Sequence, residues 1–280
     1  MDLSVIIPVY NEEESLPVLH SALQQALSDS GLTWEAIYIN DGSQDGSIQV
    51  LERLAEEDPG HTRVVDFRRN FGQTAAIAAG IDYSQGQIIV LMDADLQNDP
   101  LDIPMMVEQI HQGYDVVSGW RANRQDAFLT RILPSRIANW LISTVTGVHL
   151  HDYGCTLKAY RREVITGFRL YGEMHRFIPA YASSVGASMI EVKVRHHARK
   201  YGKTKYGINR TIKVILDLFT VKFLLSYANK PIYLFGGTGI LLMLISSIAM
   251  LLLAIRRVVF SIPVLSSPIF QVSTMVFMPS

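Results

Sequence analysis

Residues 88–100 read "IIVLMDADLQNDP", an apolar run that leads straight into a cluster of carboxylates. The five residues 88–92 have the length and composition of a buried strand. Asp93 and Asp95 follow at once, with Gln97 and Asp99 close behind them. Carboxylates this close repel one another, so we expect a positive charge to lie beside them. The stretch therefore predicts a strand whose end carries a polar site.

Apolar runs of strand length alternate with segments of helical spacing over the first two-thirds of the chain. The strand-like runs are residues 3–10, 34–41, 62–69 and 87–95, and the helical segments between them are residues 13–31, 47–58 and 72–86. This βαβα order predicts an α/β fold, with a parallel sheet covered by helices on both faces. Ligands bind such sheets beyond the carboxyl ends of the strands, so the polar residues found there should converge on one crevice. They are Tyr10, Asn11, Glu12, Asp41, Asp93, Asp95 and Asp99.

Overall composition narrows the class of protein only slightly. The net charge of −1 over 280 residues identifies no partner, and we do not expect the protein to bind nucleic acid. Cys155 is the one cysteine, which rules out an internal disulfide and fits a reducing compartment. The N-terminus has no basic region of the kind that opens a signal peptide.

The last third of the chain has the pattern of a membrane attachment. Seven Lys or Arg lie between Arg195 and Lys213, and residues 207–230 form an amphipathic segment. Residues 231–255 carry no charge, which predicts a helix that crosses a bilayer. The basic residues before this span predict that the preceding domain is cytoplasmic, at a cell inner membrane. Residues 256–280 end in a shorter apolar segment, which we interpret as an incomplete second span.

An earlier amphipathic segment, residues 128–145, allows two interpretations. One helical side carries Leu129, Leu133, Ile137, Trp140 and Leu141. A helix of this kind can lie in the lipid headgroup layer. An ordinary helix that packs on a protein core shows the same stripe, so the pattern alone does not decide between them.

The acidic cluster predicts a site for a hard cation. If the chain turns between Asp93 and Asp95, their oxygens can converge on Mg²⁺ or Mn²⁺, which prefer such ligands. The alternative is that acids after a strand cap the next helix, and Asp99-Pro100 has that form. The sequence lacks both the G-x-G-x-x-G pattern and the P-loop pattern, which disfavours a nicotinamide domain and excludes P-loop chemistry. Basic side chains such as Arg121 and Arg199 could hold a diphosphate.

Six segments together resemble the polyprenyl-phosphate glycosyltransferases over residues 3–257. In chain order they are "SVIIPVYNEEESL", "INDGSQDGS", "NFGQTAAIAAG", "LMDADLQNDP", "DVVSGWR" and "RKYGKTKY". These are inverting enzymes of the GT-A fold, akin to dolichol-phosphate mannose synthase. Three further segments, "RANRQD", "HDYGCTLKAYRREV" and "RFIPAYAS", are similar to the bacterial branch. That branch loads formylated aminoarabinose or glucose onto undecaprenyl phosphate.

The resemblance implies a role for each matching residue on the donor side. Pro8, Tyr10 and Glu12 match positions that hold the nucleoside, and Asp41 matches the acid beside the base and ribose. The metal motif is matched by Asp93 and Asp95, with Gln97 as a further metal-side ligand. The implied cofactor is Mg²⁺ or Mn²⁺.

The resemblance also implies roles on the phosphate side. Arg121 matches a position near the acceptor or donor phosphate, and Asp152 matches the catalytic carboxylate, so that Asp152, Arg121 and Asp95 become the catalytic candidates. Basic residues that meet the lipid phosphate are matched by Arg131 and Arg136. The mobile loop that closes over the diphosphates is matched by Arg199 and Lys205.

These roles imply a GT-A catalytic domain at residues 1–206 that includes the helix 128–145. A juxtamembrane helix (207–230), the span (231–255) and the incomplete segment (256–280) follow it. The implied reaction moves a sugar from a nucleotide-sugar, with UDP favoured over GDP, to undecaprenyl phosphate. The partners are the donor, the polyprenyl phosphate and the membrane, and related enzymes form homo-oligomers, especially tetramers.

Three questions stay open at this point. A lipid monophosphate has a second pKa of about 6, so it needs no strong base, and Asp152 could orient a substrate or serve only as a turn residue. A processive polysaccharide synthase shares the GT-A core, although the chain lacks its Q-x-x-R-W element. An inactive, membrane-anchored sugar-nucleotide-binding protein is the other alternative, against which the intact acids and basic loop argue. The sequence does not identify the sugar.

Overall fold

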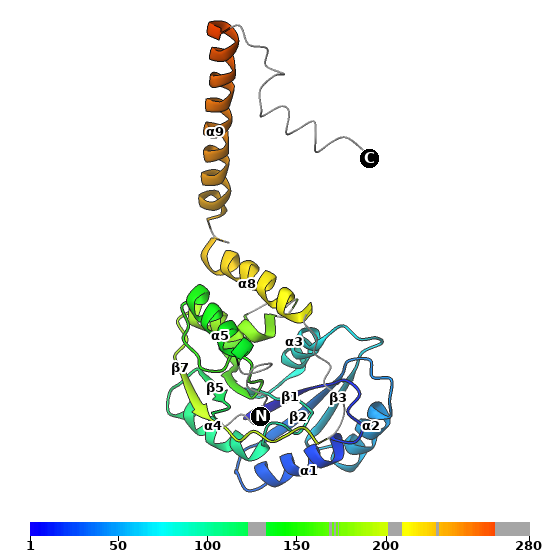
Figure 1. Ribbon diagram of the computed structural model, residues 1–280. Helices are drawn as coiled ribbons and strands as arrows, with labels where there is room; N and C mark the ends of the chain where they lie inside the picture. The colour runs from blue at the N-terminus through cyan, green and yellow to red at the C-terminus, as the bar shows by residue number, and fades with distance from the viewer. Residues whose placement is uncertain are drawn as a thin grey trace. The chain divides into compact units, whose positions relative to one another are not determined.

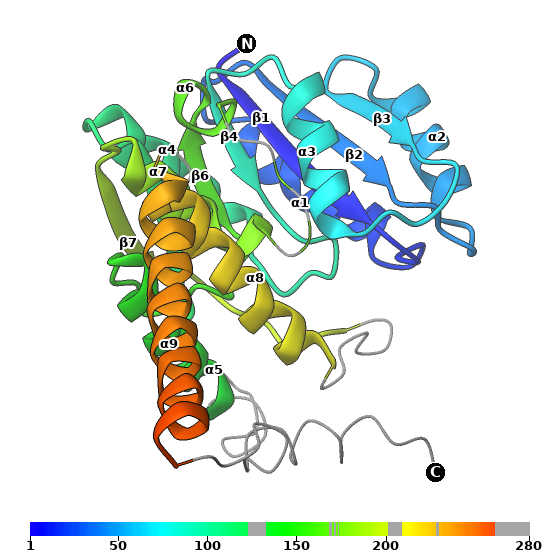
Figure 2. The same ribbon diagram turned by 90° about the horizontal axis from the view of Figure 1, so that it is seen from above.

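The computed structural model describes residues 1–122, 133–167, 170, 172, 174–200, 209–227 and 230–260. The chain divides into two compact units, Met1–Leu225 and Ser226–Ser280, each of which is described by itself. The first unit contains a seven-stranded sheet with the strand order β3-β2-β1-β4-β6-β5-β7, whose strands are labelled between Figure 1 and Figure 2.

The first four strands form the predicted parallel part of the sheet. They are β1 (Leu3–Val9), β2 (Trp34–Asn40), β3 (Thr62–Asp66) and β4 (Ile88–Leu91). β1 lies between β2 and β4, and β3 pairs with the outer side of β2. All three pairs are parallel, so the ends of β1, β2 and β4 face the same edge, as the sequence predicts.

The rest of the sheet is mixed, and its strands are not among those that the sequence predicts. Its strands are β5 (Val116–Trp120), β6 (Lys158–Arg161) and β7 (Met189–Lys193). β5 and β7 are parallel, whereas β6 runs antiparallel to both β4 and β5. Because β6 is reversed, its first residue, Lys158, pairs with the last residue of β4, Leu91. The beginning of β6 therefore lies at the same edge as the ends of the parallel strands.

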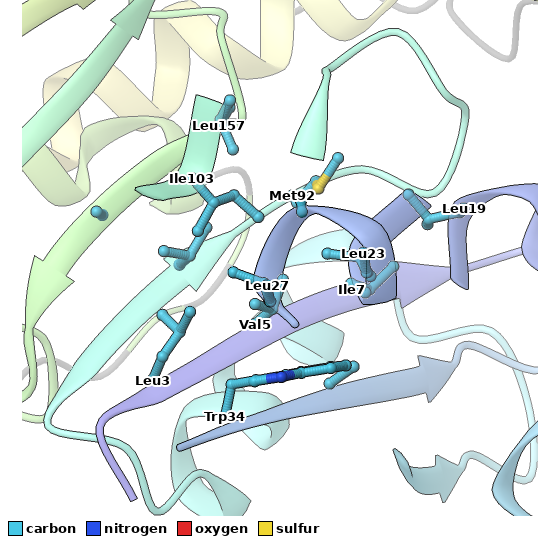
Figure 3. Close-up of a cluster of buried hydrophobic side chains, with 14 of the residues drawn as sticks. Leu3, Val5, Ile7, Leu19, Leu23, Leu27, Trp34, Met92, Ile103 and Leu157 are labelled. Carbon is cyan, nitrogen blue, oxygen red and sulfur yellow. The ribbon is translucent and has the colours of Figure 1, made fainter. Parts of the chain in front are cut away.

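Helices cover both faces of this sheet because side chains alternate along the strands. Val5 and Ile7 face one core cluster and Ile6 faces the other. Figure 3 shows the first cluster, where Val5 and Ile7 meet Leu19, Leu23 and Leu27 of a helix. The helices on this face are α1 (Leu16–Leu27), α2 (Ser47–Glu57) and α4 (Ile103–His111). The other face carries α3 (Gln73–Tyr83), α6 (Arg162–Ile165) and α7 (Ile178–Ser184).

α3 packs unusually close to the sheet at Gly80. A Cβ atom added to Gly80 would lie 2.3 Å from Cγ2 of Ile6 and 2.9 Å from Cδ1 of Ile39. Only glycine leaves room for this approach, so the residue fixes how α3 lies across β1 and β2.

A third core cluster joins two further helices to the first unit. They are α5 (Leu133–Thr146) and α8 (Asn209–Tyr227) (Figure 2). Ile142 of α5 and Leu218 and Val221 of α8 are buried in this cluster. Trp140 is 67% exposed, and Leu216 and Phe219 on α8 are exposed as well. Helix α5 thus packs on a core through Ile142, as the second interpretation of residues 128–145 expects. It also presents an exposed tryptophan, and its place in the lipid headgroup layer stays a prediction. Leu129 and the side chains of Leu133 and Ile137 lie outside the described residues.

The second unit contains the helix α9 (Pro231–Phe260). Its residues Pro231–Val259 are long and apolar enough to cross a membrane, and an 18-residue window among them has a mean hydropathy of 2.5. This matches the span predicted at residues 231–255. Residues 261–280 and the predicted boundary at residue 206 lie outside the described residues, so those parts of the domain division stay predictions.

Candidate active site

The guanidinium of Arg199 joins acids that follow two neighbouring strands. Its Nη2 atom lies 2.5 Å from Oδ2 of Asp95, which follows β4, and its Nη1 atom lies 3.8 Å from Oε1 of Glu12, which follows β1. Both carboxylates are almost fully buried. The strand ends therefore converge as the sequence predicts, and an arginine of the chain itself supplies positive charge between them.

The segment that contains Arg199 follows the acidic loop over several residues. We call residues 195–199 the basic segment. Arg195 pairs with Asp102 at 2.9 Å and lies 3.5 Å from Asp99. His197 Nε2 lies 3.1 Å from Asp99 Oδ2, and the His197 N–H donates to the carbonyl of Gln97. The positive charge expected beside "DADLQND" thus comes from two arginines of one segment, Arg195 and Arg199.

Asp99 also caps the next helical turn, as the sequence predicts. Its Oδ1 atom accepts a hydrogen bond from the N–H of Leu101 at 3.0 Å, and Pro100 occupies the first position of the short 3₁₀ helix Pro100–Asp102. This contact engages one carboxylate oxygen, while the pair with His197 uses the other.

The backbone of the acidic loop is strained at Leu96. This residue has a φ of +60°, a conformation that costs roughly 1–2 kcal/mol for a residue with a Cβ atom. The Leu96 side chain is buried in the first core cluster, which offsets the cost. Beside it, Oδ1 of Asp95 accepts a hydrogen bond from the N–H of Gln97. Strain of this kind persists at functional sites when the surroundings enforce it.

Asp93 is held by side chains from two other elements. Gln73, at the start of α3, donates from Nε2 to Oδ1 at 2.8 Å. Thr156, in the loop before β6, donates from Oγ1 to Oδ2 at 2.8 Å and itself accepts a hydrogen bond from Asn98. Each oxygen of Asp93 thus already has one donor, whereas Asp95 is paired with the guanidinium of Arg199.

The predicted metal ligands Asp93, Asp95 and Gln97 lie together on this loop. In the part of the chain that the structure describes, no group of three or more His, Cys, Asp or Glu side chains could hold a metal ion. Two carboxylates and an amide oxygen nevertheless suit Mg²⁺ or Mn²⁺, because Mg²⁺ commonly keeps several waters and takes substrate phosphates as ligands. The donor set fits a cation that is shared with a diphosphate.

The predicted nucleoside residues lie at the ends of β1 and β2. Pro8 and Tyr10 are half-buried there. Asp41 is buried, and its oxygens accept hydrogen bonds from the N–H groups of Phe71 at 2.7 Å and Gly72 at 2.9 Å. Burial raises the pKa of Asp41 above its ordinary value, although the two hydrogen bonds act against it. The contacts seen are with the loop before α3, and the role of Asp41 beside the base and ribose stays a prediction.

Asp152 and Arg121 form a bidentate ion pair. Arg121 donates from Nε to Oδ2 at 2.7 Å and from Nη2 to Oδ1 at 2.9 Å. Burial alone would lower the pKa of Arg121, but the Asp152 carboxylate outweighs burial and raises it. A carboxylate that is held in this way by a guanidinium is a weak base. Of the roles left open for Asp152, the geometry therefore favours orientation over proton abstraction.

Sequence reasoning missed several polar residues that support this site. They are Gln73, Thr156, Lys158 and Glu191. One of them carries a signal in the sequence, since Lys158 is the single charged residue of "TLKAY" (156–160). Cys155 lies nearby, and burial raises the pKa of its thiol to about 11, so the thiol stays protonated near neutral pH.

Three predicted phosphate-side residues cannot be placed. Arg131 and Lys205 lie outside the described residues, and so does the side chain of Arg136 on α5. Their roles stay predictions.

An α/β sheet with an acidic loop and arginines at its carboxyl edge is the architecture of a GT-A glycosyltransferase. The family model described as "Glycosyl transferase family 2" matches residues 4–168, more than half of the chain, and the chain belongs to that family. The predicted class of enzyme and the predicted fold are both confirmed.

Two relatives match almost the whole chain. A dodecaprenyl-phosphate galacturonate synthase from Rhizobium johnstonii is 41% identical, over 100% of this chain and 84% of that protein. An undecaprenyl-phosphate 4-deoxy-4-formamido-L-arabinose transferase from Pseudomonas aeruginosa is 38% identical, over 99% of this chain and 80% of that protein. Both names describe transferases of a sugar to a polyprenyl phosphate.

Solved structures show the same fold at lower identity. Glucosyl-3-phosphoglycerate synthase from Mycobacterium tuberculosis in complex with UDP has a TM-score of 0.60 and 20% identity, over 79% of this chain and 80% of that chain. The same enzyme with Mn²⁺, UDP and glucosyl-3-phosphoglycerate has a TM-score of 0.60 and 17% identity, over 80% and 79%. At these identities the likeness establishes the fold alone. GT-A structures of this kind bind Mn²⁺ or Mg²⁺ together with UDP.

Proposed function

We propose that this chain transfers a sugar from a UDP-sugar to a polyprenyl phosphate of the undecaprenyl type, at the cytoplasmic face of a cell inner membrane. One observation carries the proposal: a donor-side acid cluster and the Asp152–Arg121 pair lie at the same edge of the sheet. Thr156 connects the two sides, since it donates to Asp93 and lies four residues after Asp152. The similarity to polyprenyl-phosphate transferases over nearly the whole chain supports the same acceptor.

The reaction is a direct displacement that inverts the anomeric carbon. A phosphate oxygen of the lipid forms the new bond to that carbon as the bond to the nucleoside diphosphate breaks. The acceptor phosphate is mostly ionised near neutral pH, so no residue has to remove a proton from it. Arg121 uses Nε and Nη2 to bind Asp152, which leaves Nη1 for a phosphate oxygen.

On the donor side, Asp93, Asp95 and Gln97 would hold Mg²⁺ or Mn²⁺. When bound, the cation supplies Lewis-acid neutralisation of the departing diphosphate. Arg199 lies at the same place and supplies a positive charge where negative charge develops, which is electrostatic stabilisation by a preplaced group. Lys205 adds a second charge on the diphosphate in this proposal.

Membrane attachment explains how a lipid acceptor reaches this site. Helix α9 provides a span, and Trp140, Leu216 and Phe219 provide exposed apolar side chains on the first unit. Tryptophan favours the bilayer interface, because its ring is apolar and its N–H is polar. In this proposal α5 and α8 lie against the headgroup layer, where the acceptor phosphate is found, and the protein assembles as a tetramer.

The test uses the full chain, purified in detergent, with Mn²⁺, undecaprenyl phosphate and a set of radiolabelled nucleotide-sugars. We expect one donor to give a lipid that carries a single sugar, and the product to disappear in Asp95→Ala. A polymer would instead indicate a processive synthase. Binding of UDP without any product would indicate an inactive binding protein. The molecular mass in detergent tests the tetramer.

A further inference from the structure

Three polar side chains form a row beneath the loop that carries Asp152. Ser118 of β5 is paired in register with Lys158 of β6 on one side and with Glu191 of β7 on the other. Residues paired across neighbouring strands have their side chains on the same face of the sheet. Ser118 is neutral and buried, so the row places a cation and an anion on either side of a hydroxyl group.

Glu191 binds two consecutive backbone N–H groups of that loop. Its oxygens accept hydrogen bonds from the N–H of His151 at 2.9 and 3.0 Å, and from the N–H of Asp152 at 3.3 Å. The ring of His151 adds a contact from Nδ1 to Oε2 at 2.8 Å. The Glu191 side chain is only 12% exposed, so these contacts are largely shielded from water.

Lys158 binds carbonyl groups further along the same loop. Its Nζ atom donates to the carbonyls of Tyr153, at 3.3 Å, and Cys155. The residue is 3% exposed, and in the described part of the chain no ion pair joins it to a carboxylate. Burial lowers the pKa of Lys158, since it disfavours the charged form. A buried ammonium whose partners are backbone carbonyls fixes a backbone path.

The contacts of Glu191 and Lys158 lie on either side of Asp152, the residue proposed to act on the acceptor. Between the N–H groups bound by Glu191 and the carbonyls bound by Lys158, the side chain of Asp152 turns toward Arg121. Residues 151–155 belong to no strand or helix, so the regular hydrogen bonds of secondary structure do not hold them. Their buried backbone groups therefore need other partners. Charged partners bind such groups more strongly than neutral ones do.

We propose that Glu191 and Lys158 are positioning residues for the reaction. They act through the backbone of residues 151–155 and hold Asp152 in the orientation that meets Arg121. The inference rests on the proposed function, because the acceptor-side role of Asp152 is part of that proposal. It adds to the site two residues to which the motifs of the sequence assign no role.

Glu191→Gln is the main test, because Glu191 is less deeply buried than Lys158. Glutamine keeps the size of the side chain but puts an N–H₂ donor where two acceptor oxygens are needed. Glu163→Gln, on the exposed surface of α6, is the matched control. For the full chain we expect kcat/KM for undecaprenyl phosphate to fall about 10- to 100-fold, which is the effect of a small misplacement at a reacting centre. The Kd of UDP with Mn²⁺ should stay at the control value.

Two further measurements separate positioning from a general loss of structure. If Glu191 acts through Asp152, then Asp152→Asn combined with Glu191→Gln should be no slower than Asp152→Asn alone, since residues in one network are not additive. Hydrogen exchange should also be faster at residues 151–155 in Glu191→Gln and unchanged elsewhere. Lys158→Met should show the same exchange pattern if it folds.

The inference is overturned if Glu191→Gln behaves like Glu163→Gln, if its effect adds fully to that of Asp152→Asn, or if UDP binding weakens in proportion to the rate. Failure of the proposed function has a different signature, because the unaltered chain would then give no lipid-linked product from any donor. The exchange experiment does not depend on activity and tests the positioning role in either case.

Discussion

Arg199→Gln should make the free protein bind Mn²⁺ more tightly and bind UDP less tightly. In the structure the guanidinium of Arg199 forms an ion pair with Asp95, with 2.5 Å between Nη2 and Oδ2. Its Nη1 atom lies 3.8 Å from Oε1 of Glu12. A divalent cation that approaches Asp95 must therefore displace or share this guanidinium. The same guanidinium attracts a diphosphate, so its loss should act in opposite directions on the two ligands.

The size of the effect follows from the contact that is lost. A hydrogen bond between charged groups contributes about 1.5–3 kcal/mol. Arg199 is 20% exposed, which favours the lower part of that range because water screens the pair. Each 1.4 kcal/mol is a factor of about ten in an equilibrium constant. We therefore expect the Kd of Mn²⁺ alone to fall about tenfold, and the Kd of UDP with saturating Mn²⁺ to rise by a similar factor.

The metal arm is measured by the electron paramagnetic resonance signal of free Mn²⁺, titrated with the detergent-purified chain. Calorimetry gives the UDP arm. Arg53→Gln is the control, since Arg53 is an exposed arginine of α2 whose loss changes the net charge by the same amount. An Mn²⁺ affinity equal to that of the control would refute competition between Arg199 and the metal. Weaker binding of Mn²⁺ would mean that the arginine supports the metal site.

Three further predictions concern the fold and the membrane face. Gly80→Ala should lower the thermal unfolding midpoint of the first unit, because the new Cβ would lie 2.3 Å from the Ile6 side chain and overpacking costs about 1–3 kcal/mol. An unchanged midpoint, measured by circular dichroism, would contradict this packing. Burial alone would raise the pKa of Glu35, but hydrogen bonds to its carboxylate outweigh burial and lower that pKa from its ordinary value of 4.5. The ionised carboxylate therefore stabilises the folded state above pH 4.5, and this stabilisation is lost as the pH falls through the lowered pKa. Glu35→Gln should accordingly flatten the acid limb of the unfolding free energy against pH. Brominated lipids should quench the fluorescence of Trp140 in reconstituted protein. If the total tryptophan fluorescence of Trp140→Phe is quenched by the same fraction, this surface lies away from the bilayer.

The parallel half of the sheet was predictable because its signals are local. Runs such as residues 3–10 and 34–41 are mostly apolar, as is typical of strands covered on both faces, and the acids at their ends mark where the strands stop. The cap at Asp99 was predictable for the same reason, since it depends on the adjacent Pro100 and Leu101.

The supporting contacts of the site were not predictable, because they join distant parts of the chain. Arg199 and Asp95 are 104 residues apart, and Glu191 and His151 are 40 apart. The family resemblance placed Arg199 near the diphosphates, but nothing local indicates that it pairs with Asp95. The reversed direction of β6 was missed in the same way, since four residues of strand carry no sign of the direction in which they will pair.

The reversed strand also affects how the protein can be made. During synthesis β1 to β4 emerge first and can assemble from the N-terminus, but the partner of the outer edge of β4 is β6, which the ribosome delivers much later. Until Lys158–Arg161 has emerged, β4 is an unpaired edge of four apolar residues, and such edges template aggregation. The carboxylates that follow it at Asp93, Asp95 and Asp99 place like charges beside this edge, where they would repel a second nascent chain. The acid cluster would then protect the growing polypeptide before it ever meets a substrate.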